Sequence, residues 1–152
     1  MMKWMYILIL IILSGCAGFN QMQADYIEQQ GVSPMSGNAD VVFVRAVNTG
    51  DNTWTFHVTV QHPDTGWDDY ADGWDVVLPD GTSIIPNAND AFTRVLLHPH
   101  DPEPFTRSQS NIIIPADVTS VTVRAHDIVD GWGGQEVTVD LTQTSGDNYT
   151  VE

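Results

Sequence analysis

The sequence predicts an all-β fold, an antiparallel β-sandwich of seven or eight strands. From residue 39 onward, short segments in which apolar and polar residues alternate recur along the chain, and a period of two is typical of half-buried strands. Clusters of Gly, Pro, Asn and Asp separate these segments at intervals of roughly ten residues. No segment shows a sustained helical period. These three observations together favour a sandwich.

The first two strands are expected to form a hairpin. Residues 39–48 are β-branched and apolar, and residues 48–52 form a turn cluster. In the strand that follows, large apolar residues alternate with polar ones, and the apolar residues are Trp54, Phe56, Val58 and Val60. Because neighbours in a strand point to opposite faces, we expect these four side chains to face the core.

The remaining strands are shorter and are separated by loops. We expect them in residues 73–78, 82–85, 91–97, 105–114, 121–125 and 137–141. The loops between them are expected in residues 62–72, 86–90, 98–104, 115–119 and 127–134, with a tight turn in residues 79–81. The loop in residues 98–104 contains three prolines, which cannot continue the centre of a sheet.

An apolar block precedes the predicted fold. Residues 4–13 are apolar and follow Lys3. As a helix they would be roughly 15 Å long, about half of a bilayer core of about 30 Å, so we expect a cleaved signal peptide. The block ends in Leu13-Ser14-Gly15-Cys16, which resembles the lipobox of bacterial lipoproteins. That resemblance implies that Cys16 receives a diacylglycerol and becomes the first residue of the mature protein.

Four regions follow from these observations. We expect a lipoprotein signal peptide in residues 1–15, a lipid-attached flexible tether in residues 16–38, the β-sandwich domain in residues 39–142 and a C-terminal tail in residues 143–152. Cys16 is the only cysteine, so no internal disulfide competes for it. Ala17, in the place of an Asp, resembles lipoproteins sent to an outer membrane, which implies a bacterial cell-envelope protein facing the periplasm.

Two further resemblances concern the predicted domain. The segment Ile114-Pro115, followed by Val118, Val121, Val123 and Ala125, resembles the start of the penultimate strand in fibronectin type III and other immunoglobulin-like domains. This implies an immunoglobulin-like sandwich. The segments 98–108 and 130–134 are similar to small bacterial envelope proteins of unassigned role.

The chain is strongly acidic. Five Lys and Arg residues stand against 20 Asp and Glu residues, a formal net charge of −15. Such a chain is repelled by nucleic acid and by anionic lipid, so we expect no nucleic-acid partner. The excess charge is interpreted as a solvated, salt-tolerant surface or as an attraction for cations and basic partners.

Counting strand reversals assigns the loops to the two ends of the sandwich. The loops 48–52, 79–81, 98–104 and 127–134 fall at one end, and the loops 62–72, 86–90 and 115–119 at the other. The first end would gather imidazole and carboxylate groups from His98, His100, Asp127 and Asp130. Such groups suit zinc, copper or nickel, although loop residues of these types are also common in plain contact with water.

The second end would gather four aspartates within nine residues, Asp64, Asp68, Asp69 and Asp72, together with His62. Carboxylate oxygens are the ligands that calcium takes. The four residues lack the alternate spacing of a calcium-binding loop, and a solvated acidic loop is the alternative interpretation. A divalent metal ion is therefore the one cofactor that the sequence suggests.

No catalytic motif occurs in the sequence. There is no Gly-x-Ser-x-Gly turn, no phosphate-binding glycine loop and no His-Glu-x-x-His. We therefore expect a non-catalytic binding or accessory module that acts through its end loops, with the membrane as one partner and an envelope protein or glycan as another. A metal-binding envelope protein that uses the His98 and His100 loop, or residues 64–72, is the alternative.

Overall fold

A computed structural model describes residues 37–100 and 104–152 of the chain. The predicted signal peptide, Cys16 and nearly all of the predicted tether lie outside the described residues. Within the described part, no helix is long and apolar enough to cross a membrane. The secondary structure of this part consists of strands joined by turns and loops.

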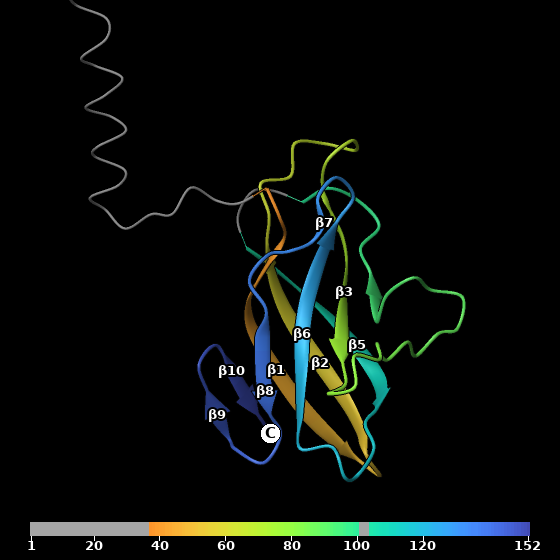
Figure 1. Cartoon of the computed structure of the whole chain (residues 1–152), viewed down its shortest axis with the longest axis vertical. Helices are drawn as coiled ribbons and strands as arrows, with labels where there is room; N and C mark the ends of the chain where they lie inside the picture. The colour runs from red at the N-terminus through yellow and green to blue at the C-terminus, as the bar shows by residue number, and fades with distance from the viewer. Residues whose placement is uncertain (1–36, 101–103) are drawn as a thin grey trace, which may run out of the picture. The chain divides into compact units, whose positions relative to one another are not determined.

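The strands of the described residues form two sheets (Figure 1). The first sheet has the order β5-β2-β1-β10-β9, and its strands are β1 (Asp40–Gly50), β2 (Thr53–Gln61), β5 (Phe105–Ile113), β9 (Ser145–Gly146) and β10 (Tyr149–Val151). The second has the order β4-β3-β6-β7, with β8 also paired to β6. Its strands are β3 (Ala71–Val77), β4 (Arg94–Val95), β6 (Ser120–Asp127), β7 (Gly131–Trp132) and β8 (Val137–Asp140).

The two sheets enclose one hydrophobic core, so the predicted all-β sandwich is confirmed. Figure 1 shows β3 and β6 side by side in front of β1 and β2. Strand β2 buries every second residue, and Trp54, Phe56, Val58 and Val60 all belong to the core as predicted. Strand β6 has the same alternation. The period of two therefore identifies the inner faces of both sheets correctly.

Residues 143–152, expected to be a C-terminal tail, belong to the first sheet instead. Strand β10 pairs with β1 in parallel, with Val44 opposite Tyr149, and β9 pairs with β10. Tyr149 is buried in the core, which explains why this short polar segment is held in place. Arg45 and Glu152 join the two strands on the exposed side through two hydrogen bonds of 2.8 and 2.7 Å.

The strand predicted in residues 82–85 is wrong. After β3, an isolated antiparallel bridge between Val77 and Ser83, flanked by backbone hydrogen bonds of 2.8 and 2.9 Å, takes the place of the expected strand. The chain then returns through β4, which runs antiparallel to the beginning of β3, so that Leu96 N–H donates to Asp72 O at 2.8 Å. Between β3 and β5 the structure has the single strand β4, whereas two strands, in residues 82–85 and 91–97, were expected.

This difference reverses the ends assigned to all later loops. Residues 98–100 lie at the same end as residues 62–70, because His100 N–H donates to Asp64 Oδ2 at 2.6 Å. Residues 127–134 lie there too, since Asp127 is close to His62 and Asp69. Residues 115–119 lie at the opposite end, where Ile114 N–H donates to Asn52 O at 3.0 Å. His98 and His100 thus do share an end with Asp127 and Asp130, but the acidic loop shares it too.

Candidate functional site

The candidate site lies where β2 ends and β3 begins. We call this region, formed by residues 62–70, 97–100 and 127–134, the β2–β3 end. His62 directly follows β2 and continues its alternation, so its side chain points inward. Asp127 is the last residue of β6 and is inward-facing for the same reason. The two residues come from different sheets, and both are buried, with 1% of His62 and 0% of Asp127 exposed.

Both ring nitrogens of His62 face hydrogen-bond acceptors. Nδ1 lies 2.6 Å from Asp64 Oδ1, and Nε2 lies 2.7 Å from the carbonyl oxygen of Gly37. A carbonyl oxygen can only accept, so Nε2–H donates to Gly37 O. These two contacts fix the orientation of the His62 ring between Asp64 and Gly37.

Asp64 holds three segments of the β2–β3 end together. Its Oδ1 accepts the His62 bond and also a bond from Ala71 N–H at 3.1 Å, while Oδ2 accepts from His100 N–H. Its side chain is completely buried. This carboxylate is therefore fixed in position by the backbone on both sides, and it fixes the orientation of the His62 ring in turn.

Two further carboxyl groups lie close to His62, and each has one oxygen that accepts no hydrogen bond. Asp69 Oδ1 lies 3.8 Å from His62 Nε2 and accepts no hydrogen bond. Asp127 Oδ1 accepts from Val129 N–H and Asp130 N–H at 2.9 and 2.6 Å, but its buried Oδ2 accepts none. One ligand atom each from His62, Asp69 and Asp127 lies within 4.8 Å of the other two. Among residues 37–100 and 104–152, this is the one such group of three or more potential metal ligands.

The histidines predicted as metal ligands stand apart from this group. The rings of His98 and His100 are 4.6 Å apart, and the His100 ring stacks on Phe105 at 3.7 Å. His98 Nδ1 lies 2.9 Å from Pro99 O. Of the four residues in that prediction, only Asp127 belongs to the three-ligand group, and Asp130 is exposed close to Gly37.

The four aspartates predicted as calcium ligands have separate environments. Asp64 is bound to His62, and Asp69 is a member of the three-ligand group. Asp68 is exposed, and Asp72 lies 2.6 Å from His126 Nδ1. The structure therefore brings together Asp127 from the first predicted cluster, Asp69 from the second, and His62, a residue of the acidic loop that was not predicted as a ligand.

Large apolar side chains are exposed in the loops of the β2–β3 end. Trp67, Leu97 and Val129 are 68%, 74% and 61% exposed, although each belongs to a different loop. A pocket of about 560 Å³ lies at the same end, with Asp64, His100 and Arg107 among its lining residues. This end thus presents both polar and apolar groups to a partner.

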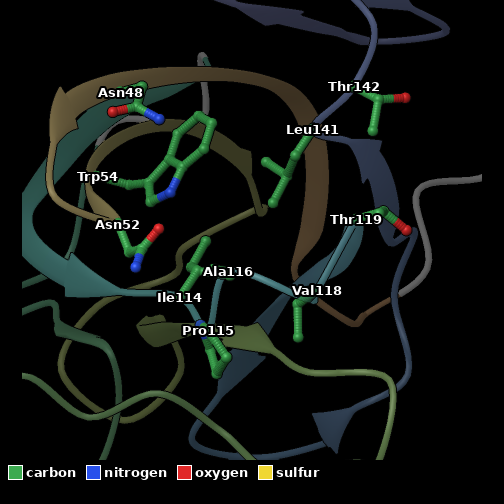
Figure 2. A pocket seen from close by; sticks show the side chains of 10 residues that line it. All are labelled: Asn48, Asn52, Trp54, Ile114, Pro115, Ala116, Val118, Thr119, Leu141 and Thr142. Atoms are coloured by element: carbon green, nitrogen blue, oxygen red, sulfur yellow. The ribbon is translucent and has the colours of Figure 1, made fainter.

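A second pocket, of about 230 Å³, lies at the opposite end of the sandwich (Figure 2). The figure shows the Trp54 indole facing Leu141 across the pocket, with the amides of Asn48 and Asn52 on either side of the ring. None of its ten lining residues has a titratable side chain. The pocket offers amide and hydroxyl groups for hydrogen bonding, from Asn48, Asn52, Thr119 and Thr142.

One comparison with known proteins gives a match. The chain is 41% identical over 102 residues to a protein of the archaeon Halomicrobium mukohataei named "Putative lipoprotein". The matched residues are 67% of this chain and 47% of the relative, so the chain spans about half of the relative's length. No family model matches the chain, and no solved structure matches it.

Proposed function

We propose that this protein is a lipid-anchored envelope protein that holds a non-catalytic β-sandwich at a membrane surface. The observation that carries the proposal is the similarity to the archaeal protein whose name calls it a lipoprotein. The run Leu13-Ser14-Gly15-Cys16 supports it independently, because it supplies the cysteine to which a lipid would be attached. The finer location, a bacterial outer membrane facing the periplasm, depends on Ala17 alone.

The β2–β3 end is the part of the domain proposed to bind. Trp67, Leu97 and Val129 expose large apolar side chains there, and aromatic side chains exposed in this way are enriched where proteins contact partners. The net charge of −15 favours a partner that carries positive charge and disfavours nucleic acid. The expected partner is an envelope protein with a basic surface around an apolar centre.

Analysis of the amino terminus tests the anchor. Wild-type protein and a Cys16→Ser variant are expressed in the native host, fractionated and examined by mass spectrometry. We expect the wild type in the membrane fraction with an acylated Cys16 as its first residue, and the variant uncleaved or without lipid. An unmodified Cys16, or a wild-type chain that still begins with Met1, would refute the anchor.

Site-specific cross-linking in intact cells tests the binding surface. A photo-reactive residue replaces Trp67 in one variant and Ile113 in the other. Ile113 is the matched control, because it is 66% exposed but lies at the opposite end of the sandwich. We expect a protein adduct from position 67 and none from position 113. Equal adducts from both positions, or none from position 67, would contradict a binding role for the β2–β3 end.

A further inference from the structure

The geometry of the three-ligand group is close to that of a metal site. Three atoms separated by at most 4.8 Å all lie within about 2.8 Å of a common point, compared with zinc–ligand bonds of about 2.0 to 2.2 Å. A shift of less than about 1 Å for each side chain would complete the coordination. Asp69 can make such a shift, because its side chain is partly exposed and its Oδ1 accepts no hydrogen bond.

The charges around His62 are unbalanced. The carboxyl groups of Asp64, Asp69 and Asp127 lie around the two histidines His62 and His100, and no arginine of the described residues forms an ion pair with any of the three acids. Buried charges are costly unless they are paired or coordinate a metal. A divalent cation would supply two positive charges at the place where Asp127 Oδ2 is buried without a donor.

The pair Asp64 and His62 has the arrangement found around metal-ligating histidines. Such a histidine usually donates one ring N–H to a carboxylate, which orients the ring and directs the other nitrogen to the metal. Here Asp64 Oδ1 accepts from Nδ1 at 2.6 Å and is itself fixed by Ala71 N–H. Nε2 is then the nitrogen on the side of Asp69. An incoming cation would replace the Nε2 proton that now bonds to Gly37 O.

We infer that His62, Asp69 and Asp127 bind a divalent first-row transition ion, represented by zinc, at the β2–β3 end. One imidazole with two carboxylates is a donor set that zinc accepts, with water completing the coordination. Calcium prefers ligand sets made of oxygen alone, so the histidine favours zinc over calcium. This inference deepens the binding role proposed for the β2–β3 end, and the rings of His98 and His100 take no part in it.

Calorimetric titration of the chelator-treated full chain in detergent with zinc chloride tests the inference. We expect one zinc ion per chain, and a rise in melting temperature on saturation, because a ligand bound only by the folded state stabilises it. The Asp127→Asn and His62→Gln variants should bind at least about tenfold more weakly, a loss comparable to that of altered metal sites. Asp69→Asn is the third ligand variant, and it is included because Asp69 is partly exposed and its substitution is less able to unfold the protein than the two buried substitutions.

Two matched controls separate the site from the acidic surface and from the loop histidines. Asp68→Asn removes the same charge from the exposed neighbour of Asp69 and should change the affinity less than twofold. The His98→Ala, His100→Ala double variant should also bind as the wild type does. Both are compared by near-ultraviolet circular dichroism to show that the fold is kept.

Four outcomes would overturn the inference. The first is that the wild type shows no saturable zinc binding, and the second is that Asp69→Asn and Asp127→Asn bind zinc as tightly as the wild type. The third is that Asp68→Asn and Asp69→Asn lose equal zinc affinity, and the fourth is that the wild type binds calcium more tightly than zinc. None of them affects the lipid analysis of Cys16 or the cross-linking at Trp67. Failure of the metal site can therefore be told apart from failure of the proposed function.

Discussion

Replacing Phe56 by Ala tests the packing on which both sheets depend. The Phe56 side chain is fully buried in the middle of β2, and its ring centroid lies 6.5 Å from that of Trp54. A buried aromatic side chain removes about 150 to 250 Å² from water, worth roughly 4 to 6 kcal/mol at about 25 cal/mol per Å². Because Ala retains part of that burial, we expect Phe56→Ala to lower the free energy of unfolding by about 3 to 5 kcal/mol.

The matched control is the next residue in the strand. His57 points to the opposite face, where its Nδ1 lies 2.6 Å from the Ser108 hydroxyl on β5. An exposed bond of this kind is worth at most about 1 kcal/mol, so His57→Ala should cost less than that. Urea titration followed by tryptophan fluorescence measures both variants. Equal losses of stability would show that the assignment of faces in β2 is wrong.

Three other substitutions or conditions give separate expectations. Asp75 is buried and accepts from Thr93 N–H at 2.9 Å, so Asp75→Ala should cost about 2 to 4 kcal/mol in urea titration, whereas the exposed Asp68→Ala should cost almost nothing. Raising the salt concentration from about 0.1 M to about 1 M shortens the screening length from about 10 Å to about 3 Å. Repulsion among the acidic groups should then fall and the melting temperature should rise. An unchanged melting temperature would contradict this expectation. Hydrogen bonds from the hydroxyl and N–H of Thr142 lower the pKa of Asp140 below its ordinary value of 3.8. The ionised form therefore stabilises the fold above that value, and this contribution is lost as the pH falls through the lowered pKa, so Asp140→Asn should lose less melting temperature than the wild type between about pH 5 and about pH 2.

The strands with the strongest alternation could be predicted because burial in them depends only on position along the strand. In β2 the inner face follows directly from the even-numbered apolar residues 54–60. The predicted strand at residues 82–85 failed because four residues of this kind fit equally well in an extended loop. In the structure, residues 82–84 make only one short bridge to the end of β3, with backbone bonds between Leu78 and Thr82 and between Ile84 and Val76. Contacts of Thr93 with Asp75 and with Ile84 O hold the rest of that loop in place. Only tertiary contacts distinguish these two cases.

The candidate site could have been found in part by extending the same alternation. His62 is the next inward-facing position after Val60, and Asp127 is the next after Ala125, so the pattern places a polar side chain at the inner end of each strand. The sequence could not predict that His62 and Asp127 lie close together. The two residues come from different sheets, and their proximity depends on how those sheets pack and on which ends of the strands coincide.

The parallel pairing of β1 with β10 has a consequence for how the domain is made. Local contacts can form the β1–β2 hairpin early. The other edge of β1 pairs with β10, which is synthesised much later. Arg45 and Glu152, which bond across this pair, are 107 residues apart in the sequence. Contacts between such distant residues slow folding, and sandwiches of this kind fold in milliseconds to seconds. Until Val151 has been made, β1 keeps an open edge that can pair with other chains. The nascent protein is therefore most prone to aggregate before β10 emerges.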